Sequence, residues 1–258
     1  MNELQFTLFP QPDYACNEAI NTLCTNLTFA GNDKRILLFT SHKPGEGKSF
    51  LSMHTMRNMA KLGYRVVLVD ADLRRSVINS HYGVRMASST NYGVSHYLAG
   101  RCALEDAIYE TNIPGAWFMP VGQVVSNSLS LLNTSRLSEM LGHLKNNFDY
   151  VLVDAPPVGT VVDAAVIAKF CDGVLLAVGY NKTNRKELVD AKHQLARSGC
   201  EILGAVLNQV DLDKLSAKKY YYKSYYTKEY YTSSDSAKTK KTKKPSLFKS
   251  FKKKKRKH

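Results

Sequence analysis

The sequence has few cysteines and no long apolar run, and each absence excludes a class of protein. Five cysteines occur among 258 residues and none belongs to a CxxC pair, so neither a disulfide framework nor a cysteine-based metal site is expected. No stretch approaches the ~18 consecutive apolar residues of a membrane span. The first residues lack a basic segment followed by an apolar one, which predicts no secretory signal and a cytoplasmic protein.

Acidic residues are nearly absent from the C-terminal end. Residues 214–258 contain 17 lysines and arginines but only Glu229 and Asp235, whereas residues 1–213 contain 19 basic and 20 acidic residues. The net charge of +14 therefore comes from the tail. This division predicts a globular domain over 1–213 and a disordered, basic, tyrosine-rich tail over 214–258, whose charge governs its choice of partners.

A glycine-rich turn near the N-terminus predicts a phosphate-binding loop. The strand-like residues 36–40 precede this turn, and a helical pattern follows it; the turn itself reads Ser41-His42-Lys43-Pro44-Gly45-Glu46-Gly47-Lys48-Ser49. Glycines let backbone N–H groups face an anion, the lysine reaches the β- and γ-phosphates, and the serine hydroxyl can hold Mg²⁺. The strict Walker spacing would place a glycine at His42, so the loop is a variant. A simple turn between a strand and a helix is the alternative.

Two further apolar runs end in carboxylates. Residues 66–69 are followed by Asp70 and Asp72, and residues 150–153 by Asp154. Ligands of open parallel sheets bind beyond the carboxyl ends of the strands, so these side chains are expected beside the phosphate loop. Asp154 has the position of a Walker B carboxylate, which orients a metal ion. A solvated acidic turn is the alternative for the other two.

Strand and helix patterns alternate from residue 36 to residue 208. This order predicts a doubly wound, mostly parallel sheet with helices on both faces. Helices are expected at 13–30, 49–62, 93–100 and 184–198, and strands at 36–40, 66–69, 116–122, 150–153, 173–178 and 202–207. The region 76–135 gives weaker patterns. Asn208 closes the last strand, where its amide could meet a purine edge or simply form a turn.

Seven of the 15 tyrosines lie within twelve residues of the tail: Tyr220, Tyr221, Tyr222, Tyr225, Tyr226, Tyr230 and Tyr231. Composition alone leaves two interpretations open. Aromatic rings among cations can stack on nucleic-acid bases, and the hydroxyls can accept phosphate. The final segment, residues 245–258, would be attracted to an anionic membrane surface by about 1 kcal/mol per Lys or Arg.

Together these motifs resemble those of the bacterial tyrosine kinases, and most closely the stand-alone cytoplasmic kinases of capsular and exopolysaccharide synthesis in Gram-positive bacteria. Residues 41–49, 67–74 and 151–157 match the Walker A, A′ and B motifs, and the tyrosine cluster matches as well. The resemblance covers about residues 14–231. It implies a P-loop NTPase that uses ATP and Mg²⁺ to phosphorylate tyrosines of its own tail, between subunits, and that regulates polysaccharide synthesis and export.

The resemblance also implies roles for individual residues. The catalytic set is Lys48, which would hold the β- and γ-phosphates, with Asp70, Asp72 and Asp154. Asp72 would be the base for the tyrosine hydroxyl. Metal binding falls to Ser49 and the same three aspartates, and ATP binding to Pro44, Gly45, Glu46, Gly47, Lys48, Ser49, Phe50 and Asn208. The seven clustered tyrosines would accept phosphate.

Partners follow from the same resemblance. They are a membrane adaptor of the polysaccharide co-polymerase type that completes the ATP site, the tails of neighbouring subunits, a protein-tyrosine phosphatase and an anionic membrane surface. Nucleic acid is not expected. The kinase would lie in the cytoplasm at the inner face of the membrane, held there by its adaptor. Relatives often carry Glu-x-x-Arg-x-x-Arg for ring assembly; here Glu18 is kept, but Asn21 and Cys24 replace the arginines, so no stable ring is expected in isolation.

Two other functions compete with the kinase. A partitioning-type P-loop ATPase would bind DNA or membrane through the basic tail, and such ATPases carry a signature lysine where Lys43 stands. A regulator without enzymatic activity would use bound ATP only to dock on the polysaccharide machinery. The tyrosine cluster favours the kinase, because a partitioning ATPase has no use for clustered tyrosines.

Overall fold

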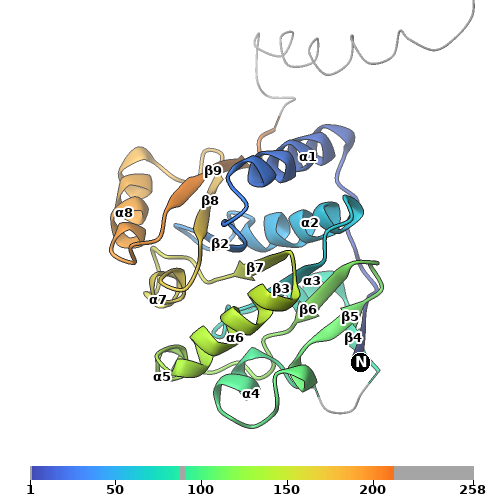
Figure 1. The fold of residues 1–258 in the computed structure, drawn as a ribbon. Helices are drawn as coiled ribbons and strands as arrows, with labels where there is room; N and C mark the ends of the chain where they lie inside the picture. The colour runs from blue at the N-terminus through green and yellow to red at the C-terminus, as the bar shows by residue number, and fades with distance from the viewer. Residues whose placement is uncertain (1, 88–90, 212–258) are drawn as a thin grey trace, which may run out of the picture. The chain divides into compact units, whose positions relative to one another are not determined.

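A nine-stranded sheet forms the centre of the described part of this computed structural model, residues 2–87 and 91–211 (Figure 1). The strand order is β4-β1-β5-β6-β3-β7-β2-β8-β9. The strands are β1 (Asn2–Phe6), β2 (Ile36–Ser41), β3 (Val66–Asp70), β4 (Val84–Met86), β5 (Tyr109–Thr111), β6 (Ala116–Met119), β7 (Tyr150–Asp154), β8 (Gly173–Gly179) and β9 (Ile202–Asn208). Only the β1–β4 and β5–β6 pairs are antiparallel, which confirms the predicted mostly parallel sheet.

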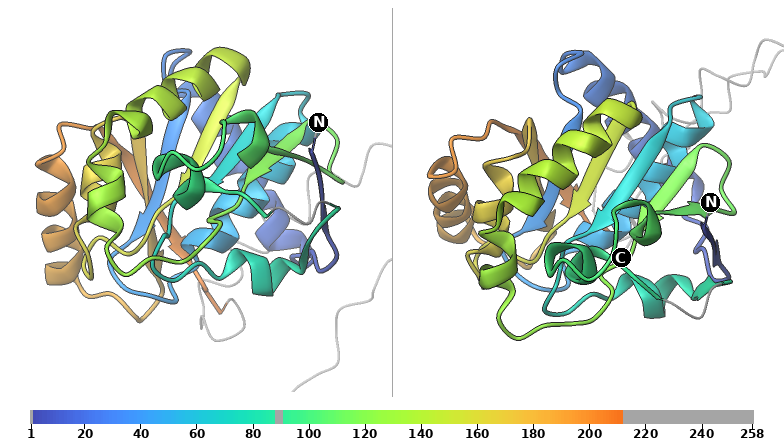
Figure 2. Two further views of the ribbon diagram at one scale, coloured as in Figure 1. Left: turned by 90° about the horizontal axis from the view of Figure 1, so that it is seen from below. Right: turned by 60° about the horizontal axis from the view of Figure 1, so that its bottom comes forward.

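Helices cover both faces of the sheet (Figures 1 and 2). They are α1 (Tyr14–Phe29), α2 (Lys48–Lys61), α3 (Ile78–Tyr82), α4 (Val94–Leu98), the short 3₁₀ helix η1 (Glu105–Ala107), α5 (Ser128–Leu132), α6 (Ser135–Asn147), α7 (Asp163–Ala168) and α8 (Arg185–Ala196). Helices α1 to α3 share one apolar core and α4 to α8 share the other. Successive residues of β2, β3 and β7 alternate between the two cores, as expected for strands that are buried on both faces.

The expected elements are present, and the structure adds several that the sequence did not suggest. Asp13 caps α1 by accepting a hydrogen bond from the Cys16 amide at 2.7 Å. The additional elements are β1, β4, β5, α3, η1, α5, α6 and α7. Helix α6 had a usable signal, because its buried residues recur at helical spacing: Leu137, Met140, Leu141 and Leu144.

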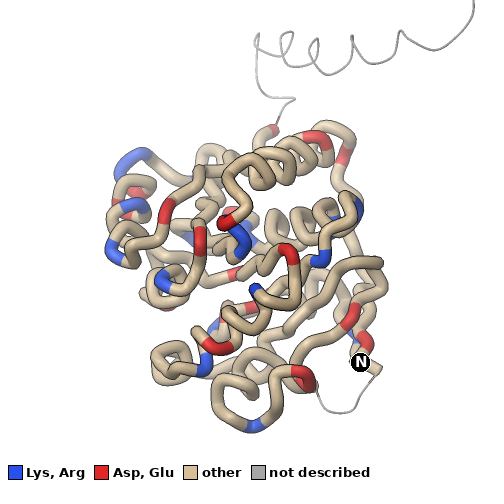
Figure 3. Tube along the Cα trace, in the orientation of Figure 1, with Lys and Arg blue, Asp and Glu red and all other residues tan. Residues whose placement is uncertain are grey.

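The two predicted parts of the chain differ in what the structure describes. Met1–Asp211 forms one compact unit, in which basic and acidic residues are interspersed (Figure 3). The predicted boundary at 213/214, the disorder of the tail and the seven tyrosines lie outside the described residues. Within residues 2–87 and 91–211, no helix has the length and apolar character needed to cross a bilayer.

Helix α2, which follows the phosphate loop, is enclosed by the sheet and by α1. Every residue from Lys48 to Ala60 except Phe50 is buried. The Asn58 amide donates to Asn21 Oδ1 at 2.9 Å, and Cys24 is fully buried with its thiol 3.9 Å from the Thr55 carbonyl oxygen. The two positions where the resemblance would place arginines therefore hold α1 against α2.

His54 lies in this enclosed helix, between aromatic rings. Its ring centroid is 4.2 Å from that of Phe50 and 5.0 Å from that of Phe9, and the residue is fully buried. Burial, and then the charge of Arg57, lowers the pKa of His54 to about 4. Between about pH 6.5 and pH 4, His54 is therefore protonated in the unfolded chain but neutral in the folded chain. The free energy of unfolding consequently falls as the pH drops through this range.

We expect His54 to reduce the free energy of unfolding by about 2 kcal/mol between pH 7 and pH 5. Urea denaturation at both pH values would measure this for the wild type and for His54→Phe, which keeps an aromatic ring but cannot titrate. The variant should lose less stability on acidification, by about that amount. Equal losses in the two proteins would contradict the assignment.

Candidate active site

Three neighbouring parallel strands bring the predicted site residues to one edge of the sheet. Strand β7 lies between β3 and β2, and all three run in the same direction. The phosphate loop follows β2. Asp70 is the last residue of β3, with Asp72 two residues after it, and Asp154 is the last residue of β7. Asp70 and Asp154 are direct partners in the β3–β7 register, so the two carboxylates are fixed side by side by backbone pairing.

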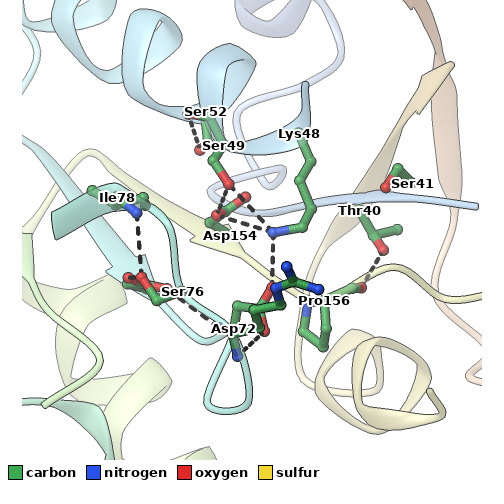
Figure 4. Close-up of polar contacts among 12 residues, drawn as sticks. Thr40, Ser41, Lys48, Ser49, Ser52, Asp72, Ser76, Ile78, Asp154 and Pro156 are labelled. Atoms are coloured by element: carbon green, nitrogen blue, oxygen red, sulfur yellow. Dashed lines mark hydrogen bonds and ion pairs between the residues drawn. The ribbon is translucent and has the colours of Figure 1, made fainter. Parts of the chain in front are cut away.

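The Lys48 ammonium lies between two carboxylates (Figure 4). Its Nζ is 3.0 Å from Asp72 Oδ2 and 3.5 Å from Asp154 Oδ2. Burial opposes the charge of the lysine, but Asp154 and then Asp72 outweigh it, so the pKa of Lys48 is raised and the ammonium stays charged. The Ser49 hydroxyl donates to the same Asp154 Oδ2 at 2.6 Å.

The site holds more buried negative charge than Lys48 balances. Asp70 and Asp72 are 0% and 4% exposed and Asp154 is 1% exposed. Burial, and then the Asp154 charge, raises the pKa of Asp70 to about 8, and burial likewise raises the pKa of Asp154. Asp154 Oδ1 is buried and accepts no hydrogen bond from the described residues. This excess of carboxylate oxygen calls for a cation.

The residues present suit Mg²⁺, which binds partly through substrate phosphates, better than a metal ion whose ligands are all protein side chains. In the described ranges, no three His, Cys, Asp or Glu side chains gather as a preformed metal site. Mg²⁺ usually keeps several waters and binds through one or two carboxylates together with substrate phosphates. Asp154 Oδ1 and the Ser49 hydroxyl, which bonds to the other oxygen of the same carboxylate, are oxygen ligands of this kind.

The amino end of α2 is left open for an anion. Asp13 caps α1 and Asn184 forms a capping box on α8, but the N-cap residue of α2 is Gly47, which has no side chain to cap the first amides of the helix. The φ angle of Gly47 is +88°, in the left-handed region that favours glycine. The uncapped N–H groups and the helix dipole attract phosphate at this point.

The remaining predicted ATP-binding residues surround the loop in different ways. Pro44 and Gly45 are exposed. The carboxylate of Glu46 is buried and accepts hydrogen bonds from the amides of Lys43 (2.8 Å) and Gly179 (3.0 Å) and from the Thr183 hydroxyl. It therefore anchors the loop to the end of β8.

Two predicted residues have contacts of another kind. The Phe50 ring packs against His54, on the side of α2 where the aromatic side chains gather. The Asn208 amide donates to the Glu46 carbonyl oxygen at 3.0 Å, so its nitrogen contacts the loop backbone. The seven tyrosines predicted as phosphate acceptors belong to the part of the chain that the structure does not describe.

Two polar contacts near the site were missed from the sequence. Lys182 Nζ and Gln209 Nε2 both donate to the Gly45 carbonyl oxygen, at 3.2 and 2.9 Å. A signal for both existed, since each closely follows the carboxyl end of a parallel strand, as Asp72 does.

An ion pair braces the Walker A′ segment and was also missed. Arg74 contacts both oxygens of the fully buried Asp163, at 2.9 and 3.3 Å, and the Ser128 hydroxyl donates to the same carboxylate. Asp163 begins α7, so the pair ties the segment after Asp72 to a helix that follows Asp154. No sequence pattern indicates this ion pair, because its partners are 89 residues apart.

Comparison with known proteins identifies the family. The AAA domain family matches residues 34–184. The tyrosine-protein kinase CpsD of Streptococcus agalactiae serotype III is 40% identical over 194 residues, which cover 75% of this chain and 82% of that relative. The chain belongs to this family of bacterial tyrosine-protein kinases. The predicted site residues Lys48, Asp70, Asp72 and Asp154 all lie within the matched domain.

Solved structures agree with this assignment. The kinase domain of the Escherichia coli tyrosine kinase ETK is 33% identical and superimposes with a TM-score of 0.70 over 75% of each chain. The septum site-determining protein MinD of Pyrococcus horikoshii, complexed with Mg-ADP, is 26% identical with a TM-score of 0.57, over 67% of this chain and 69% of its own. The kinase therefore shares its P-loop fold with a protein that was solved in complex with Mg-ADP.

Gly47→Ala should weaken binding of Mg-ADP by at least about tenfold. An added β-carbon would lie 1.9 Å from Asn208 Nδ2, and alanine disfavours the left-handed backbone. Calorimetric titration of the kinase would measure the affinity. Gly142→Ala is the matched control, since a β-carbon there meets nothing within 4 Å, and its affinity should equal that of the wild type. Wild-type affinity in Gly47→Ala would refute this account of the loop.

Proposed function

We propose that this kinase transfers the γ-phosphoryl group of ATP to tyrosines of its own C-terminal cluster, in a neighbouring subunit, and so regulates capsular or exopolysaccharide synthesis and export. The main supporting observation is the buried Lys48 ammonium between Asp72 and Asp154, beside the uncapped start of α2. The chain also carries seven clustered tyrosines that can accept the group.

The proposed reaction assigns phosphate binding, metal binding and proton transfer to residues according to their positions in the site. The amides at the start of α2 and the Lys48 ammonium bind the β- and γ-phosphates. Ser49 and the aspartates would hold Mg²⁺, which would supply positive charge to the phosphate oxygens. The tyrosine oxygen bonds to the γ-phosphorus while the bond from that phosphorus to the β–γ bridging oxygen breaks, and ADP leaves with the electron pair. Asp72 accepts the hydroxyl proton.

The assignment of the base to Asp72 rests on how the two aspartates are held. Asp70 is fully enclosed, and its carboxylate accepts hydrogen bonds from the Asp72 amide at 3.3 Å and from the Ser76 hydroxyl. Asp70 thus fixes the backbone that carries Asp72. Asp72 lies two residues beyond the end of β3, 3.0 Å from the Lys48 ammonium that would bind the transferred phosphate.

The proposal includes an adaptor and a place in the cell. Asn21 and Cys24 contact α2, so they do not offer the arginine contacts that would assemble a ring. We propose that a membrane adaptor of the polysaccharide co-polymerase type brings subunits together, completes the ATP site and holds the kinase at the inner face of the membrane. A protein-tyrosine phosphatase would reverse the modification.

Lys43, which would be the signature lysine of a partitioning-type ATPase, has partners in its own chain. The Lys43 ammonium lies 2.7 Å from Glu187 Oε1 and donates to the Lys182 carbonyl oxygen at 3.2 Å. The lysine is therefore engaged within its own chain, at the start of α8.

The full chain, incubated with Mg-ATP and a peptide from the adaptor's cytoplasmic end, should gain phosphate on residues 220–231, as read by mass spectrometry. Lys48→Met should reduce the rate by about 100-fold or more, because the charge that stabilises the transferring phosphoryl group is lost. Lys192→Met, at an exposed position on α8, is the control and should behave as the wild type.

Two outcomes would contradict the kinase proposal. ATP turnover without phosphotyrosine would favour the ATPase. Unchanged polymer output in cells that express Lys48→Met would favour a regulator that only docks.

Phosphorylation should also release the tail from anionic membranes. Each phosphotyrosine carries about −1.5 to −2, so seven would add roughly −10 to −14 to a tail of net charge +15. Cosedimentation with phosphatidylserine vesicles should fall on phosphorylation, and uncharged phosphatidylcholine vesicles serve as the control. Equal binding of the modified and unmodified protein to the anionic vesicles would exclude this effect.

A further inference from the structure

The carbonyl groups of the phosphate loop are held from outside by three side chains. The Gly45 oxygen accepts hydrogen bonds from Gln209 Nε2 at 2.9 Å and from Lys182 Nζ at 3.2 Å, and the Glu46 oxygen accepts one from Asn208 Nδ2 at 3.0 Å. All three donors come from segments at the ends of β8 and β9. The loop is thus attached to the two strands at one end of the sheet.

These bonds fix the direction of the loop amides. In a trans peptide the carbonyl oxygen and the following N–H point to opposite sides. Since the oxygens of Gly45 and Glu46 face the three donors, the N–H groups of Glu46 and Gly47 face away from them. In the part of the chain that the structure describes, neither N–H donates to another protein group. Both therefore remain available to an anion, together with the uncapped amides of α2.

The backbone beside these donors is strained. Across the described residues, only Asn181 and Gln209 have positive φ angles without being glycine, at 57° and 60°. One immediately precedes Lys182 and the other carries a donor itself. Such conformations are unfavourable and are retained mainly where the surrounding structure or a function requires them.

We propose that Gln209 and Lys182 are positioning residues for nucleotide binding. They act on the ligand through the backbone, by holding the amides of Glu46 and Gly47 towards the β- and γ-phosphates. Their donor atoms are already bound to the Gly45 oxygen, so no direct contact with the nucleotide is needed. This inference rests on the proposed ATP-binding function.

The variants Gln209→Gly and Lys182→Met test this role in the full chain. Glycine removes the donor and also accepts the left-handed backbone, so folding should be preserved. Methionine keeps the length of the lysine but has no N–H group. The affinities for Mg-ADP and for magnesium pyrophosphate are measured by calorimetry, and the Tm of each unliganded protein is measured alongside. Lys192→Met serves as the control for a lost surface charge.

Each variant should raise the Kd for both ligands by about three- to tenfold, because one hydrogen bond that orients the cradle is lost. The Tm of the unliganded protein and the affinities of Lys192→Met should not change. Pyrophosphate separates the two ways of acting, since it has no base or ribose. A loss of affinity confined to ADP would overturn the proposal by showing direct contact with the nucleoside.

Unchanged affinities in both variants would also overturn the positioning role. Failure of the proposed function looks different, because the wild type itself would then bind neither Mg-ADP nor pyrophosphate. A lower Tm with unchanged affinities would show that the two residues serve only the fold.

Discussion

The buried ammonium of Lys48 and the carboxylates around it are the interaction on which the rest of the structure depends. Three aspartates removed from water are unfavourable as anions unless positive charge lies close to them, and the single lysine balances only one. The raised pKa of Asp70, about 8, expresses this cost. The surrounding strands β2, β3 and β7 are buried along their whole length, which holds these charges in fixed positions. The negative charge that Lys48 does not balance favours a divalent cation, and Mg²⁺ is typically bound by one or two carboxylates together with nucleotide phosphates.

The register of the strands determines where these charged groups lie. Asp154 is opposite Phe39 in β2 and opposite Asp70 in β3. One residue of β7 therefore fixes the relative positions of the phosphate loop, which follows β2, and of the segment that follows β3. The pairing continues past the strand, since the Ala71 amide donates to the Asp154 carbonyl oxygen at 2.8 Å. A shift of one residue in either pair would turn the carboxylates to the opposite face. The fully apolar interiors of these strands oppose such a shift, because the same residues fill both cores.

The sequence predicted the centre of this fold well and its margins poorly, for a physical reason. Strands buried on both faces appear as unbroken apolar runs, and their carboxyl ends must meet, so Lys48, Asp70, Asp72 and Asp154 could be placed together without a structure. Strands β1, β4 and β5 are three to five residues long and lie towards one edge of the sheet, where few apolar positions are needed. The pair of Arg74 with Asp163 joins residues far apart in sequence. Arg74 belongs to the Walker A′ motif, but nothing local indicates that Asp163 is its partner.

The segment after β9 shows why the loop needs support from outside the motif itself. A left-handed conformation at Gln209 costs about 1 kcal/mol, and a hydrogen bond to the Gly45 oxygen returns about as much. The two terms nearly cancel in the unliganded protein, so this attachment adds little to folding. Its value appears when phosphate oxygens meet amides that already point towards them, because the ligand then does not have to order the loop. The glycines that let the loop approach a phosphate also leave it free to turn away, and the strand ends supply the constraint that glycine cannot.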